Sequence, residues 1–212
     1  MRRCYCTLTL LLLLALPLTT VAQYPERTSP ENVLAKLEQA YEAMDAAAYL
    51  DCLAPGFVFH LASSDWQSDP GLPEYWGFSE ESAVHGNMFH PSSIVEHVTV
   101  SLNVLSWSHD PGTDPGDPSD DRWISFAESV VWFHCQSDIV YLASSAQEFT
   151  LRVDPDDQGA GGETLYDIIE WSEIEFLASG RESTTWGCVK AMFYSETPVD
   201  GTNWTRIKAL YR

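Results

Sequence analysis

A change of hydrophobic period halfway along the chain is the feature that most constrains the fold. Apolar residues recur at every second position in four long segments of the second half, residues 94–107, 123–135, 139–153 and 165–176. In the first of them Val98, Val100 and Leu102 share one face. Such alternation is typical of antiparallel strands with one buried and one exposed face. The acidic, Pro- and Gly-rich stretches 110–121 and 154–162 read as hairpin loops between strands.

The first half shows helical spacing instead. Apolar residues recur there three and four positions apart, and Ser29 and Asp45 stand where they can cap the first two helices. The pattern predicts helices over residues 30–44, 46–53 and 79–89, a strand over 57–61 and a loop over 63–73. This order of elements predicts an α+β fold in which a strongly curved antiparallel sheet is roofed by three N-terminal helices.

Residues 1–22 are predicted to be a signal peptide. Arg2 and Arg3 precede an apolar run over residues 8–18, and Thr20 to Ala22 form a cleavage region. The run is shorter than the about 20 residues needed to cross a bilayer. We therefore expect cleavage before Gln23, an exported (periplasmic or extracellular) mature chain, and no stable membrane insertion after processing.

The length and the net charge of the chain limit the number of domains and the classes of binding partner. Residues 23–212 are enough for one core, so we expect a single domain in which 177–212 form a C-terminal extension. Within it, 186–193 and 204–211 repeat the order Trp, aliphatic, Lys, Ala, aliphatic, aromatic. The formal net charge is −20, without clustered Lys and Arg, and this excludes nucleic acid as a partner.

The sequence predicts no cofactor and no metal site. Cys52, Cys135 and Cys188 form no Cys-x-x-Cys pair; we expect buried thiols or at most one internal bridge. His85 and His90 are five residues apart, whereas two ligands on one helical face are three or four apart.

Taken together, the elements resemble the NTF2-like superfamily, specifically its SnoaL-like branch. The resemblance covers about residues 29–176 and is carried by the helices at 29–44, 45–53 and 76–89, the strand at 54–60 and the segment 165–171. It implies a cone in which helices cover the hollow of a bent sheet, with room for a small apolar molecule. The superfamily includes isomerases, dehydratases, cyclases and hydrolases beside non-catalytic binding or dimerising proteins, so the fold alone assigns no activity.

Candidate pocket residues follow from the strand at 123–135. Its even-numbered face is apolar except for Glu128 and His134, and a carboxylate among apolar neighbours is costly unless it is paired or used. His60 ends the first strand and Tyr75 precedes the third helix, where both can reach a pocket. The predicted catalytic residues are Glu128, His60, His134 and Tyr75, and the predicted ligand-binding residues are Trp76, Phe126, Trp132 and Tyr41.

Three functions fit this reading. The first is binding of a small, largely apolar molecule in the cone pocket. The second is an enzyme of the isomerase, dehydratase or hydrolase type that uses an acid–base pair in the pocket. The third is a non-catalytic homodimer, which requires a broad apolar patch on the exposed sheet face. A hollow filled by Trp and Phe side chains would favour a structural role over catalysis.

Overall fold

The fold is built on one sheet. The computed structural model describes residues 23–68, 71–113, 121–174, 185–191 and 193–194. In this part of the chain the strand order is β2-β1-β6-β5-β4-β3, and every neighbouring pair is antiparallel except β1 and β6, which are parallel. The strands are β1 (Leu53–His60), β2 (Tyr75–Gly77), β3 (Val95–Asp110), β4 (Arg122–Cys135), β5 (Ile139–Gln158) and β6 (Thr164–Ile174).

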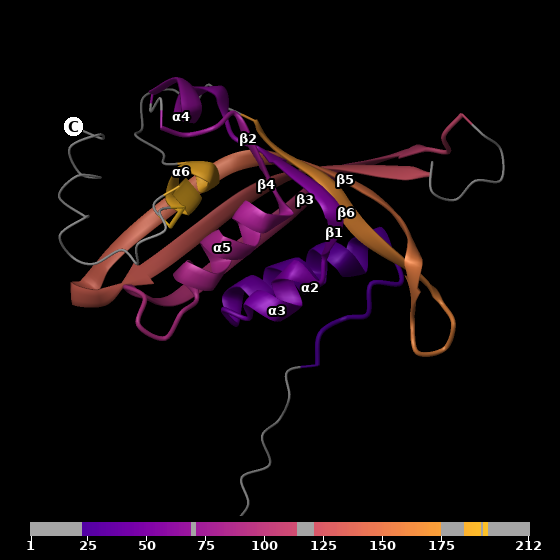
Figure 1. The fold of residues 1–212 in the computed structure, drawn as a ribbon, viewed down its shortest axis with the longest axis horizontal. Coiled ribbons are helices and arrows are strands. Elements are labelled where there is room, and N and C mark those ends of the chain that lie inside the picture. Colours follow the sequence, from indigo (N-terminus) through magenta and orange to yellow (C-terminus); the bar gives the residue numbers. More distant parts are fainter. Residues whose placement is uncertain (1–22, 69–70, 114–120, 175–184, 192, 195–212) are drawn as a thin grey trace, which may run out of the picture.

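The sheet bends where its ladders are interrupted (Figure 1). The register of β3 against β4 shifts between Val104 and Ser106, and that of β6 against β5 shifts between Ile168 and Glu170. An extra residue on one strand of a pair bends that strand and increases its twist. These two bulges therefore help to give the sheet a concave face.

Helices cover the concave face. In Figure 1, α2 (Pro30–Glu42), α3 (Ala46–Leu50) and α5 (Phe78–Met88) lie on the same side of the sheet. The first two begin as the sequence predicts: Ser29 Oγ accepts a hydrogen bond from the backbone N–H of Asn32 at 3.3 Å, and Asp45 caps α3 through Ala48 N–H at 3.0 Å. Such caps satisfy N–H groups that have no partner inside the helix.

The predicted fold class is confirmed: a curved sheet is roofed by three N-terminal helices. The predicted loop over 63–73 is wrong in part, because it contains α4 (Ser63–Ser68), and two further elements were not predicted, β2 and α6 (Trp186–Ala191). Residues 1–22 and the second tail repeat, 204–211, lie outside the described residues. Within the described residues, no helix has both the length and the apolar character that a membrane span requires.

Helix α2 also covers the free edge of the sheet. β3 is an edge strand, and the backbone N–H groups of Val100 and Leu102 donate to Glu42 Oε1 at 3.0 Å and Glu38 Oε1 at 3.1 Å. Burial raises the pKa of Glu38, and the hydrogen bond from Leu102 opposes this rise. Because these N–H groups are occupied, a further strand cannot pair with this stretch of the edge.

A buried arginine fastens the N-terminal segment to the β5–β6 hairpin. Arg27 is 6 % exposed and forms an ion pair with Asp167, which is 5 % exposed. Its Nη2 also lies 3.2 Å from Asp157 Oδ2, and its Nη1 donates to the carbonyl oxygen of Tyr166 at 3.2 Å. One guanidinium therefore joins residues about 130 to 140 positions apart in the sequence.

Replacing Arg27 with Met should lower the free energy of unfolding by about 3–5 kcal/mol, because the substitution leaves the buried Asp167 carboxylate without its cation. Denaturant unfolding measures this change. The matched control is Lys36→Met, which removes a cation from Asp51, a half-exposed partner, and should cost below about 1 kcal/mol. Equal losses in the two variants would contradict the anchoring role of Arg27.

Candidate functional site

Aromatic side chains fill the hollow between the helices and the sheet. Trp171 of β6, Trp186 of α6, Tyr41 of α2 and Phe133 of β4 are at most 1 % exposed. The ring centroid of Trp186 lies 4.8 Å from that of Trp171 and 4.9 Å from that of Tyr41, in edge-to-face geometry, and Trp186 Nε1 donates to the Tyr41 hydroxyl at 2.9 Å. The first repeat of the C-terminal extension is therefore part of the core.

A polar cluster lies inside this aromatic core, centred on the carboxylate of Glu81 on α5. Glu81 Oε1 is 2.5 Å from Nζ of Lys190 on α6 and also accepts a hydrogen bond from the Tyr49 hydroxyl of α3. Trp76 Nε1 of β2 donates to Oε2 at 2.6 Å. Glu81, Lys190 and Tyr49 have no exposed surface, so this is an ion pair fully removed from water.

The environment fixes the charge states of this pair. Burial alone would raise the pKa of Glu81, but the Lys190 ammonium, with further help from the hydrogen bond that Tyr49 donates, holds it below the ordinary value. Burial lowers the pKa of Lys190, and the Glu81 carboxylate opposes that effect. The pair is therefore read as carboxylate and ammonium, each stabilised by the other.

His85 occupies the same cluster as a neutral imidazole. Its ring stacks on that of Tyr49 at 3.9 Å, and Nδ1 lies 2.9 Å from the backbone carbonyl oxygen of Glu81, which can only accept. The proton therefore resides on Nδ1, and Nε2 carries a lone pair for which the described residues offer no hydrogen-bond partner. Burial lowers the pKa of His85 to about 4.

A second buried carboxylate, Glu173 of β6, holds the start of α6. Its Oε1 accepts from the backbone N–H of Trp186 at 2.6 Å and its Oε2 from that of Gly187 at 2.7 Å. Ser145 Oγ donates to Oε1 at 2.5 Å. Burial raises the pKa of Glu173, although the Ser145 hydrogen bond opposes this. Glu173 and Glu81 together fix both ends of α6 in the hollow.

The predicted placement of four β4 residues in the pocket is wrong. Glu128, His134, Phe126 and Trp132 lie on the outer face, since the odd-numbered residues of β4 are the buried ones. The ring of Phe133 lies 6.2 Å from that of Tyr41, so the odd face contacts the helices. Glu128 is exposed, and His134 stacks at 3.8 Å on His97 of β3.

The other predicted residues divide between the two faces. His60 points outward, where Nε2 lies 3.0 Å from Glu170 Oε1, and Tyr75 is 59 % exposed. The expectation that these two residues reach a pocket is therefore wrong. Trp76 and Tyr41 do lie inside the hollow, at 2 % and 0 % exposure; their predicted role in ligand binding stays a prediction.

The residues that sequence reasoning missed carry a recognisable signal. Four residues at helical spacing are buried on α5: Glu81, Val84, His85 and Met88. A Glu and a His four residues apart on one apolar stripe could have been read as inward-facing. The described residues contain no group of three or more His, Cys, Asp or Glu able to hold a metal ion.

A half-open pocket of about 190 Å³ lies between α2 and β3. Its walls are apolar, and two glutamates of α2 stand among its lining residues. We call this the α2–β3 pocket; it is lined by Glu31, Leu34, Ala35, Glu38, Leu102, Val104 and Trp107. Its volume is below the roughly 300–1,000 Å³ of drug-sized sites but above an engineered cavity of about 150 Å³ that binds benzene.

The neutral state of His85 gives a testable pH dependence. Its pKa is about 6.5 in the unfolded chain and about 4 in the folded one, so between these values the unfolded state binds the additional proton. The contribution of His85 to the free energy of unfolding is present above about pH 6.5 and is lost as the pH falls to 4. Wild type should therefore lose about 3 kcal/mol more than His85→Phe between pH 7 and pH 4.

Denaturant unfolding over that pH range measures the difference. The readout is the change with pH, so a constant packing cost of the Phe ring does not affect it. His90→Phe is the matched control, because His90 is exposed next to the end of α5. Parallel pH profiles for wild type and His85→Phe would contradict a neutral buried imidazole.

Comparison with known proteins bears on the fold. No protein-family model and no curated protein matches the sequence. Solved structures similar to the chain include an NTF2-like protein with a cystatin-like fold from Novosphingobium aromaticivorans, with 14 % identity, coverage of 73 % of this chain and 84 % of that one, and a TM-score of 0.43.

Two further structures are similar. A ketosteroid isomerase-like protein from Erwinia carotovora atroseptica has 15 % identity, covers 70 % of this chain and 94 % of its own, and has a TM-score of 0.38. A conserved protein from Planctomyces limnophilus has 12 % identity, coverage of 68 % and 91 %, and a TM-score of 0.47. At these identities the likeness concerns the fold alone. By the arrangement of its own helices and strands, the chain has the curved sheet roofed by three N-terminal helices that its sequence pattern predicts.

Proposed function

We propose that this protein is a non-catalytic carrier of a small, largely apolar molecule, which it holds in the α2–β3 pocket. The observation that carries the proposal is the apolar wall of that pocket, formed by Leu34, Leu102 and Val104 beside the glutamates of α2. A single ring or a short chain suits its volume of about 190 Å³. Export, as the first 22 residues suggest, is part of the same proposal.

The polar rim indicates which kind of molecule fits best. Glu38 is partly buried, and one of its oxygens already accepts from Leu102 N–H. Burial raises its pKa, with a further contribution from the charge of Glu42. A ligand that brings a hydrogen-bond donor to the free oxygen of Glu38 would relieve this cost. We therefore expect an apolar body with one donor group.

The arrangement of acids and bases argues against the enzyme alternative. Catalysis by an acid–base pair requires both groups within reach of one bound substrate. Glu128 and His60 lie on the outer face of the sheet, and Glu81 and His85 are enclosed without exposed surface. In the described residues, neither pair combines an accessible space with two converging groups.

The probe for this proposal is 4-fluorobenzyl alcohol, a single ring with one donor, observed by fluorine NMR. We expect saturable binding with a Kd on the order of 1 mM, which corresponds to about −4 kcal/mol. Ala35→Phe should abolish it, because Ala35 lines the pocket and the added ring occupies it. Ala47→Phe, an exposed alanine of α3, is the matched control and should bind normally. Absence of saturation in wild type, or equal binding in both variants, would refute the proposal.

A specific observation favours a second function, homodimerisation through the outer sheet face. Trp132, Val140 and Leu142 are 42 %, 46 % and 37 % exposed, and Trp132 and Leu142 are direct cross-strand neighbours. Large apolar side chains gathered on one exposed surface are typical of protein contacts. These three side chains support the dimer interpretation, which requires an apolar patch on this face.

If this face forms a dimer, sedimentation velocity at micromolar concentration should show wild type as a dimer and Trp132→Lys as a monomer. Lysine is chosen because it reduces the net charge of −20, so loss of the dimer cannot be assigned to added repulsion. Leu105→Lys changes another exposed apolar residue, on β3, and should remain dimeric. A monomeric wild type at about 100 μM would eliminate this second function.

A further inference from the structure

Lys190 is bound as an amine ligand would be bound. Its ammonium lies 4.0 Å from the ring centroid of Phe59 and 4.0 Å from that of Trp171, in addition to 2.5 Å from Glu81 Oε1. The ring of Trp186 is 5.5 Å away. Aromatic faces attract cations, most strongly where water is excluded, and aromatic cages are a recurrent way of binding organic ammonium groups. Lysine is almost never fully buried without such partners.

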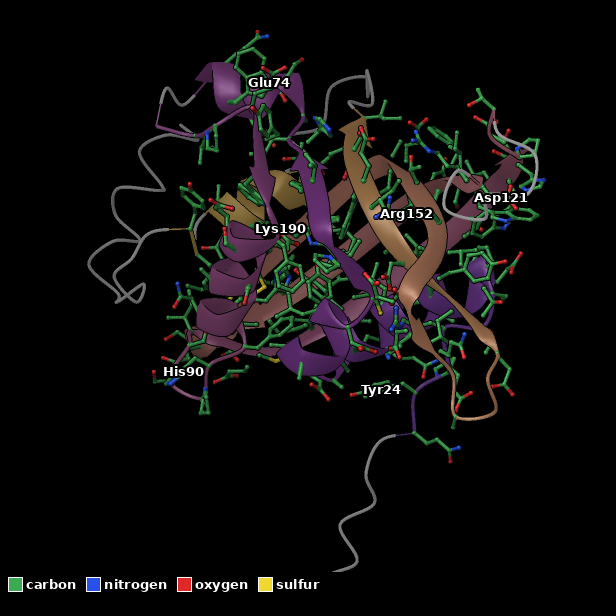
Figure 2. The ribbon with its side chains drawn as sticks, turned by 45° about the vertical axis from the view of Figure 1, so that its right-hand side comes forward. Tyr24, Glu74, His90, Asp121, Arg152 and Lys190 are labelled. Atoms are coloured by element: carbon green, nitrogen blue, oxygen red, sulfur yellow. The ribbon has the colours of Figure 1, made fainter. Side chains whose placement is uncertain are left out.

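The cage and its cation come from different parts of the chain. Phe59 belongs to β1, Trp171 to β6 and Glu81 to α5, all of which precede residue 175. The cation belongs to α6, in the C-terminal extension that the resemblance does not cover. Figure 2 shows Lys190 near the middle of the molecule. The body thus supplies a negative, aromatic site and the extension supplies the group that fills it.

The remaining polar groups around this site also fit a cation. Tyr49 and Trp76 donate to the Glu81 carboxylate and leave its charge in place. His85 is neutral, so it adds no competing positive charge. In the described residues of the cluster, the Lys190 ammonium therefore contacts the Glu81 carboxylate, and the charge of Glu173 at the start of α6 adds to the attraction.

We propose that the hollow contains a binding site for a primary alkylammonium group, formed by Phe59, Trp171 and Glu81, and that α6 occupies it as an intramolecular ligand. An external amine reaches this site when the Lys190 side chain is absent. The site is separate from the α2–β3 pocket and does not depend on the function proposed for that pocket. The chemical class it takes is a primary amine on a short apolar chain.

Chemical rescue tests the proposal. Lys190→Ala removes the atoms that n-propylammonium contains, and so creates a space of matching shape and charge. At ten times its Kd, n-propylammonium should raise the Tm of this variant by about 3–6 °C, with saturation. Propan-1-ol has the same length without the charge and should give a far smaller rise. Tetramethylammonium, which is too wide for the space, should also fail.

Two matched variants complete the design. Lys36→Ala removes a lysine from an ion pair with Asp51, outside the hollow, and its Tm should not respond to the amine. Lys190→Met removes the charge but fills the space, so it should also show no response. If Lys190→Ala does not fold by itself, refolding in n-propylammonium against propan-1-ol provides the same comparison through the yield of soluble protein.

Each result of the rescue experiment either supports or overturns the ammonium site. A saturable rise, or a refolding yield, that is specific to n-propylammonium and to Lys190→Ala supports the ammonium site. An equal effect of propan-1-ol would mean that the space only takes apolar volume, and this would overturn the proposal. An equal response of Lys36→Ala, or no response of any variant, would overturn it as well.

Discussion

The ion pair between Glu81 and Lys190 is the interaction on which the interior depends. Removing two charges from water costs several kcal/mol for each, and only close geometry with additional hydrogen bonds compensates for it. Tyr49 and Trp76 supply those bonds on the side of Glu81, and aromatic faces surround the ammonium. Four elements, α3, α5, α6 and β2, must therefore be in place together. Without α6 the carboxylate would remain in an apolar hollow with no cation, so the extension is a condition for the stability of the body.

A filled hollow changes what this architecture can do. A curved sheet with helices on its concave face offers space for a ligand, but here Trp186 and Lys190 take that space. Among the described residues, an accessible pocket lies instead between α2 and β3, at the edge of the sheet. The lone pair of His85 Nε2 is the one unsatisfied polar atom of the described cluster around Glu81, and such an atom costs about 1–3 kcal/mol. The interior is consequently specific in its packing without being open to a substrate.

The sequence was sufficient to predict most helices and strands, but it was not sufficient to predict which face of the sheet is buried. Periodicity located the four long strands and three N-terminal helices, because strands and helices bury a side at periods that the sequence displays directly. Periodicity did not identify the buried face of β4, because both faces of this strand carry apolar residues. Its inner face includes the small buried residues Ser125, Ala127 and Ser129. The outer face carries the larger residues Phe126 and Trp132, so hydrophobicity alone selected the wrong side.

Long-range partners explain why the site itself was missed. Glu81 and Lys190 are 109 residues apart, and nothing local to either position predicts the other. The tail repeat did show Trp and Lys four residues apart, which is the spacing of residues on one helical face. This spacing does not show which other part of the chain that face packs against.

The small size of the inner residues of β4 and the packing of the large residues in the hollow depend on each other. Ser129 is 1 % exposed and accepts a hydrogen bond from Gln147, whose Oε1 in turn accepts from Trp171 Nε1 at 2.5 Å. A larger residue at 129 would push Gln147 away and leave the indole N–H of Trp171 without an acceptor. Since Trp171 is also one wall of the cage around Lys190, the size of a side chain on β4 is linked through this chain of contacts to the position of α6. The outer face has no such restriction, and this difference allows large apolar residues to accumulate there.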